Sequence, residues 1–175
     1  PLNREVVRII SPGTLTEDNL LERTSNNFLG SISNFNGFVS VSWVDVSTGC
    51  FKTREIVKEK NQSNQKQLLT NFLLRMDFSE ILVSEDMDLN LIGDEWHCVI
   101  KKQPSSLFHY TSCLEQICSY YSVISLDGIG SFKEGEIIAA GVLLSYLKLT
   151  QCGKIPIFSM IENETENNFL EIDYF

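Results

Sequence analysis

The chain has 175 residues, of which 43% are hydrophobic, 21% charged and 10% aromatic, and its formal net charge is −9. This length and composition are typical of one globular domain with a full hydrophobic core. An acidic chain without clustered Lys and Arg is a poor binder of phosphate backbones, which argues against a nucleic-acid-binding protein. The longest apolar run, residues 137–144, is too short to span a bilayer, which argues against a transmembrane protein.

The first elements are expected to be strands joined by tight turns. A strand over residues 6–10 and a short helix capped by Thr14 or Thr16 open the chain. Apolar and polar residues alternate over residues 39–43, and a second such run covers residues 50–56. A Ser-Thr-Gly turn separates the two runs, so this region is predicted to be a β-hairpin.

Helices and strands alternate in the second half of the chain. Apolar spacing and short apolar runs predict an amphipathic helix around residues 69–76, strands over 80–86 and 96–102, and a second amphipathic helix over 114–121. Ser131 and Glu134 have capping-box spacing and predict a long helix that runs to about Leu149. This order of elements indicates a single α/β domain around a mixed sheet.

The two ends of the chain and its cysteines indicate its origin. The sequence begins without a leader and ends within an apolar stretch, so we expect it to be an excised piece of a larger protein. The five cysteines are an odd number in a chain that needs no disulfides for stability. Reduced thiols are the simpler interpretation, and we therefore expect a soluble cytoplasmic protein that does not bind membranes.

Motifs for phosphate, zinc and nucleophilic chemistry are incomplete. The glycines at 128, 130 and 135 precede a helix but lack the Lys and Ser or Thr of a phosphate loop, and a glycine turn feeding a helix is expected. The His and Cys residues lack the paired spacing of a zinc site. The chain has no G-x-S-x-G nucleophile elbow. A catalytic triad assembled from distant residues stays open as an alternative.

Acidic side chains at strand ends are the remaining chemical candidates. Asp45 ends the first hairpin strand, and Glu85 and Asp86 end the strand over residues 80–86. Carboxylates at neighbouring strand ends could hold Mg²⁺ for phosphodiester hydrolysis. A metal-dependent nuclease using Asp45, Glu85 and Asp86 is therefore an alternative hypothesis, and turn formation is the competing interpretation of the same residues.

Four stretches of the sequence resemble bacterial MutS proteins. "REVVRIISPGTLTEDNLL" (4–21) resembles the segment that joins their mismatch-binding and connector domains. "WVDVSTGCF" (43–51) and "EILVSED" (80–86) resemble connector strands, and "AAGVLLSYLKLTQCGKIPI" (139–157) resembles a helix and the tail that leads into the core domain. The resemblance covers nearly the whole chain.

This resemblance implies a ribonuclease-H-like α/β fold. We expect a mixed β-sheet flanked by helices, in a single domain with extended terminal segments. By comparison with the family, residues 1–13 are expected to be a linker strand from the mismatch-binding domain. Residues 14–153 are expected to be the connector domain, and residues 154–175 the start of the core, or lever, domain.

The function implied is a relay and a docking surface, without catalysis. In the family the connector links the mismatch-binding and ATPase domains and contacts MutL. The matching partner-binding positions are Glu115 and Gln116, with Lys148 as a weaker candidate, although Glu115 stands where Gln is usual. No metal or cofactor is implied for this segment. The larger protein is expected to be a homodimeric, DNA-dependent ATPase that uses ATP, ADP and Mg and contacts mismatched DNA through its other domains.

Overall fold

In the part of the chain that the structure describes, six strands form one mixed sheet in the order β5-β4-β1-β2-β3-β6. The computed structural model describes residues 27–59, 63–92 and 98–164, so the predicted strand over 6–10 and the predicted helix after Thr14 lie outside it. The elements in chain order are β1 (Phe28–Phe35), β2 (Phe38–Asp45), β3 (Cys50–Val57), α1 (Gln65–Met76), β4 (Glu80–Ser84), the 3₁₀ turn η2 (Leu89–Leu91), β5 (Val99–Gln103), the 3₁₀ turn η3 (Ser105–Leu107), α2 (Tyr110–Tyr121), α3 (Glu134–Thr150) and β6 (Glu162–Asn163).

Strand β1 is absent from the predicted elements and is the largest addition made by the structure. It pairs with β2 in antiparallel register from Phe28 opposite Asp45 to Phe35 opposite Phe38. The two residues between the strands, Asn36 and Gly37, both have positive φ, 53° and 86°. Two-residue turns of this kind favour Asn-Gly because their backbone twist matches that of the flanking strands.

The other predicted strands are confirmed with small shifts of their ends. β2 and β3 form the predicted hairpin. β4 and β5 correspond to the predicted strands over 80–86 and 96–102, and residues 96–97 of the second strand lie outside the described ranges. β4 is parallel to both β1 and β5. The mixed α/β sheet is therefore confirmed, and its order is consistent with a ribonuclease-H-like fold.

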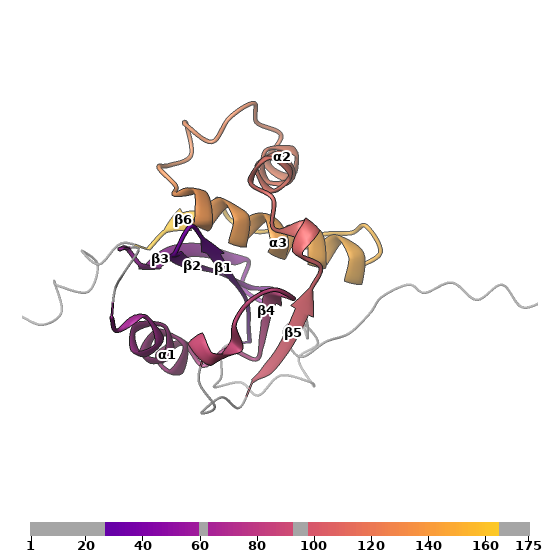
Figure 1. Ribbon diagram of the computed structural model, residues 1–175. Coiled ribbons are helices and arrows are strands. Elements are labelled where there is room, and N and C mark those ends of the chain that lie inside the picture. The colour runs from indigo at the N-terminus through magenta and orange to yellow at the C-terminus, as the bar shows by residue number, and fades with distance from the viewer. Residues whose placement is uncertain (1–26, 60–62, 93–97, 165–175) are drawn as a thin grey trace, which may run out of the picture.

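Helix α1 covers one face of the sheet (Figure 1). The predicted apolar stripe is buried there, and the centroid of the Phe72 ring lies 5.5 Å from that of Trp43. Phe78 is only 4% exposed and packs edge-on against Trp43. These aromatic side chains bury large apolar areas, so this face forms its own hydrophobic core.

Helix α3 covers the opposite face, and α2 lies outside α3 as a third layer (Figure 1). The run Ile137–Leu144 is buried on all sides because α3 is enclosed between the sheet and α2. A helix that is apolar all round is stable only where both of its sides are covered. Within the described ranges, no helix has the length and hydropathy needed to cross a membrane.

The predicted capping box at the start of α3 is wrong. The residue at the N-cap is Lys133, and no side chain caps the helix there. The Ser131 carbonyl instead accepts a hydrogen bond from the Asn163 side chain of β6, at 3.3 Å. The helix starts later than the motif predicts because its first turn is held by tertiary contacts.

Candidate functional site

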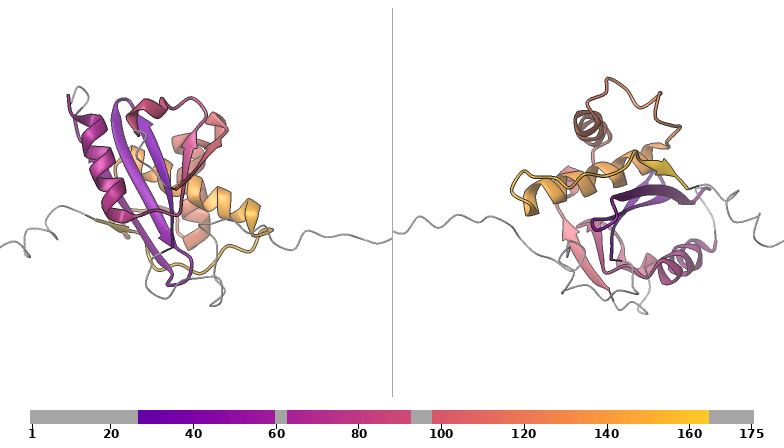
Figure 2. Two further views of the ribbon diagram at one scale, coloured as in Figure 1. Left: turned by 90° about the horizontal axis from the view of Figure 1, so that it is seen from below. Right: turned by 180° about the vertical axis from the view of Figure 1, so that it is seen from behind.

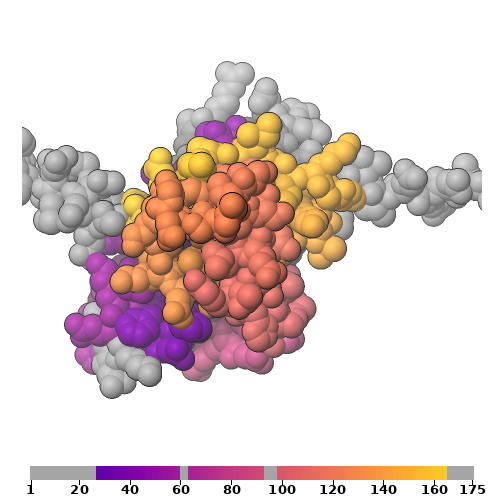
Figure 3. Space-filling model, turned by 90° about the horizontal axis from the view of Figure 1, so that it is seen from above, coloured from indigo at the N-terminus to yellow at the C-terminus, as the bar shows by residue number. Residues whose placement is uncertain are grey.

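Helix α2 displays the predicted partner-binding residues on the outside of the molecule. Cys113 and Ile117 are buried and face α3, whereas Glu115 is exposed and Gln116 is half-buried. Figure 3 looks onto this outer layer and shows α2, the α2–α3 connection and the residues after α3 on one face. The helix ends at Ser122, whose left-handed backbone (φ 55°) allows its N–H to bond the last carbonyls of α2.

The position of α2 depends on a close crossing with α3. A Cβ atom added at Gly141 would lie only 2.3 Å from the Cβ of Cys113 and 2.5 Å from its Cα. The two helix backbones can approach this closely only because residue 141 is glycine. Cys113 is 1% exposed, and burial raises the pKa of its thiol to about 12. The thiol therefore stays protonated and has a packing role.

Lys148 lies on a different helix from the other two candidates. It is exposed in the last turn of α3, two turns or about 10 Å along the axis beyond Gly141. Its neighbour Leu149 is also exposed, to 71%. Glu115 and Gln116 thus form one surface on α2, and Lys148 stays a separate prediction.

The predicted carboxylate site is wrong, because the sheet places its members at opposite ends. Asp45 pairs with Phe28 at the start of β1, since β2 is antiparallel to β1. β4 is parallel to β1, so Ser84 and the acids after it lie level with Ser33. Five residues at about 3.3 Å each separate the two levels by about 17 Å. Asp45 cannot share one metal ion with Glu85 and Asp86.

The Asp45 carboxylate stabilises a turn, as the competing interpretation proposed, whereas the Glu85 carboxylate binds the start of η3. Asp45 Oδ1 accepts hydrogen bonds from the backbone N–H of Ser47 at 2.9 Å and from its hydroxyl at 2.6 Å. Glu85 Oε1 accepts from the backbone N–H and hydroxyl of Ser105 at 3.0 and 3.3 Å. Across residues 27–59, 63–92 and 98–164, three or more Asp, Glu, His or Cys side chains nowhere gather as a metal site would require.

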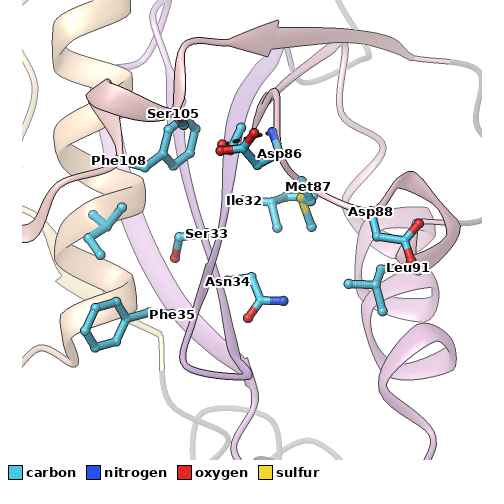
Figure 4. A pocket seen from close by; sticks show the side chains of 12 residues that line it. Ile32, Ser33, Asn34, Phe35, Asp86, Met87, Asp88, Leu91, Ser105 and Phe108 are labelled. Carbon is cyan, nitrogen blue, oxygen red and sulfur yellow. Dashed lines mark hydrogen bonds between the residues drawn. The ribbon is translucent and has the colours of Figure 1, made fainter.

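A cavity of about 450 Å³ opens at the carboxyl end of β1 and β4. Crevices at this edge of a parallel sheet often bind ligands. Figure 4 shows Asp86 beside Ser105 and, farther away, Asp88 beside Leu91. Two of the polar side chains around the cavity bond the local backbone: Ser84 Oγ accepts from the N–H of Asp86, and Asp88 Oδ1 accepts from the N–H of Asn90. They stabilise the turns that surround the cavity.

Two sets of polar contacts between distant segments of the described chain were not predicted from the sequence. The buried carboxylate of Glu80 accepts a hydrogen bond from the Tyr146 hydroxyl at 2.6 Å and lies 3.3 Å from the Lys101 ammonium. At the start of α3, Glu136 accepts from the Asn163 side chain at 2.6 Å. An acid within the apolar run that begins α3 was the available signal for the second set.

The pKa of Glu136 is raised to about 7, chiefly because burial disfavours its charged form. The side chain is only 2% exposed. Because the pKa is lower in the unfolded chain, the unfolded state loses its proton first as the pH rises. Stability contributed by this group is therefore complete below about pH 4.5, falls between about pH 4.5 and 7, and is constant above that range.

We expect Glu136→Gln to abolish this decline and to stabilise the chain by at most about 3 kcal/mol at pH 8, since one pKa unit corresponds to about 1.4 kcal/mol. Urea unfolding at a series of pH values from 4 to 8 measures the effect. Glu134→Gln is the control, because Glu134 is exposed in the same helical turn. Parallel pH profiles for the wild type and Glu136→Gln would contradict the prediction.

Comparisons with known proteins agree with this architecture. Residues 27–159 match the family model described as MutS domain II. The chain is 34% identical over 174 residues to the DNA mismatch repair protein MutS of Roseobacter denitrificans, covering 98% of the chain and 19% of that protein. It is 35% identical over 176 residues to the MutS protein of Wolbachia pipientis, covering 98% and 20%. The chain thus spans about a fifth of the length of these relatives.

Proposed function

Because the chain belongs to the MutS domain II family of DNA mismatch repair proteins, we propose that it is a relay and docking module that performs no chemical step itself. The observation that supports this is the layered packing of α2 on α3 and of α3 on the sheet. A rigid stack can transmit a change in docking from one face to another without local chemistry. It also presents the outer face of α2 in a defined orientation.

The proposed partner is a MutL-type protein that binds the α2 surface formed by Glu115 and Gln116. Glu115 is exposed and Gln116 is half-buried, so both can contact a partner without any rearrangement of the core. A carboxylate and an amide together offer acceptors and donors that suit a polar interface. Lys148 on α3 is proposed as a weaker contact.

The roles of the larger protein are part of the same proposal. Residues 1–13 would lead in from the mismatch-binding domain, residues 14–153 would form the connector, and residues 154–175 would begin the core domain. ATP, ADP and Mg would bind elsewhere in a homodimeric, cytoplasmic ATPase, and mismatched DNA would be contacted by other domains. The chain alone is therefore expected to bind neither ATP nor heteroduplex DNA.

We expect the double substitution Glu115→Ala and Gln116→Ala to weaken binding to the MutL N-terminal domain about tenfold. Each lost interfacial hydrogen bond is worth about 0.5–1.5 kcal/mol, and tenfold corresponds to about 1.4 kcal/mol. Isothermal titration calorimetry or a biosensor would measure the affinity of the 175-residue chain. Lys148→Ala is expected to have a smaller effect.

Lys66→Ala with Gln67→Ala is the matched control. These two exposed residues lie on α1, a helix that covers the other face of the sheet. Their substitution also removes one charged group, of opposite sign, and one amide, and it should leave the affinity unchanged. If the α2 double substitution also leaves it unchanged, Glu115 and Gln116 are not the partner-binding residues.

A further inference from the structure

The residues after α3 turn back along that helix and form a strap, defined here as residues 154–164 (Figure 2). Gly153, with φ +83°, reverses the chain. Two apolar side chains of the strap, Phe158 and Ile161, are only 6% and 3% exposed, whereas Ile157 is 93% exposed. The strap is therefore bound to the domain by one face.

The inner face of the strap is fixed to the sheet. The centroids of the Phe158 and Phe51 rings lie 5.6 Å apart, and the rings meet edge-on. The Ser159 N–H donates to the Gly49 carbonyl at 2.8 Å, and β6 within the strap pairs with β3 in parallel register. These contacts fix the position of the strap beside the carboxyl end of α2.

Two neighbouring tyrosines at the end of α2 bind the strap directly. The Tyr120 hydroxyl donates to the Pro156 carbonyl at 2.7 Å and accepts from the Phe158 N–H at 2.8 Å. The Tyr121 hydroxyl donates to the Ser159 carbonyl at 2.8 Å. Burial raises the pKa of both hydroxyls, so they remain protonated donors near neutral pH.

Among the described residues, helix α2 is held by α3 at the Gly141 crossing and by the strap at its carboxyl end. Gln116 and Tyr120 are four residues apart in the same helix, so they are neighbours on one helical face. The strap contacts thus lie one helical turn from the proposed partner-binding surface.

We propose that the strap regulates the α2 surface. While residues 154–164 are seated, the tyrosine bonds hold α2 in one orientation, and displacement of the strap removes the support at the carboxyl end of α2 and loosens the helix. Its consequence for partner binding rests on the function proposed above, because Glu115 and Gln116 lie on this helix. The coupling between strap and helix is reciprocal, as for any two linked equilibria.

Amide hydrogen exchange on the 175-residue chain tests the coupling without any partner. Phe158→Ala removes the main apolar anchor of the strap, and Tyr120→Phe with Tyr121→Phe removes the hydroxyls while keeping both rings. In both variants the amides of residues 114–121 are expected to exchange at least tenfold faster. Amides of β1 and β4 should change by less than twofold.

Tyr110→Phe is the matched control, since it removes a hydroxyl from the opposite end of the same helix. It should leave exchange in residues 114–121 within twofold of the wild type. The proposal is overturned if strap amides exchange faster while α2 amides keep their wild-type rates. Should Phe158→Ala fail to fold, the tyrosine variant alone decides.

Measuring the affinity of the variants for the MutL N-terminal domain distinguishes this proposal from the proposed function. If α2 exchange responds to the strap but Glu115→Ala with Gln116→Ala leaves binding unchanged, the coupling stands and the partner site is wrong. If Glu115→Ala with Gln116→Ala weakens binding but the strap variants leave amide exchange in α2 unchanged, the partner site stands and the proposed regulation is wrong.

Discussion

Gly141→Ala is expected to destabilise the chain by about 2 kcal/mol, although Gly to Ala inside a helix normally stabilises by about 0.5–1 kcal/mol. The new methyl group would lie 2.5 Å from Cys113 Cα and 2.9 Å from the Cys113 carbonyl oxygen. Backbone atoms cannot rotate away, so α2 must move off α3. Overpacking of this kind costs about 1–3 kcal/mol, and the rigid contact indicates the upper end. The gain of about 0.5–1 kcal/mol in helix propensity reduces this cost to a net loss of about 2 kcal/mol.

Thermal or urea unfolding measures the change, and a loss of about 2 kcal/mol corresponds to a fall in Tm of about 4–8 °C for a chain of this size. Gly128→Ala is the control, because a Cβ there would meet no atom within 4 Å. A more stable Gly141→Ala variant would show that the two helices are not in close contact. Since α2 carries Glu115 and Gln116, the same substitution should also weaken partner binding.

Lys101→Met is expected to destabilise the chain by about 3 kcal/mol, because it removes the cation beside a buried carboxylate. Glu80 is fully buried, and its Oε1 lies 3.3 Å from the Lys101 ammonium. The pKa of Lys101 is raised, chiefly by its hydrogen bond to the Tyr146 hydroxyl at 3.1 Å. Because the Lys101 side chain is 38% exposed and partly screened by water, we expect a loss of stability at the lower end of the range for buried pairs.

Adding Glu80→Gln to Lys101→Met should recover most of the lost stability. The neutral amide no longer needs a cation, and its oxygen can still accept from the Tyr146 hydroxyl. Urea unfolding of the wild type, the two single variants and the double variant completes the cycle. Lys102→Met is the control, since Lys102 is the exposed neighbour on the same strand. Additive losses in the double variant would contradict the prediction.

Local sequence patterns determined most of the elements, because their signals come from residues close together in the chain. The apolar stripe that includes Phe72 predicted α1, and the alternation around Trp43 predicted the β2–β3 hairpin. The family resemblance predicted the mixed sheet, and the match to MutS domain II agrees with it. The Asn36-Gly37 pair was a local signal of the same kind and would also have predicted β1.

The positions of the functional groups were decided only by the tertiary structure. Asp45 ends β2 and Asp86 follows β4, and the opposite directions of these two strands place the acids at opposite ends of the sheet. Strand direction depends on pairing between distant segments, which no local pattern encodes.

The same reason explains the polar contacts that went unpredicted. Glu80 meets Tyr146 across 66 residues of sequence, and Tyr121 meets Ser159 across 38. Residue type and spacing predicted most of the helices and strands, and the resemblance of four stretches to bacterial MutS proteins indicated the family. The orientation of α2, its close crossing at Gly141 and its attachment to the strap exist only once the layers have packed, because each depends on atoms from separate parts of the chain.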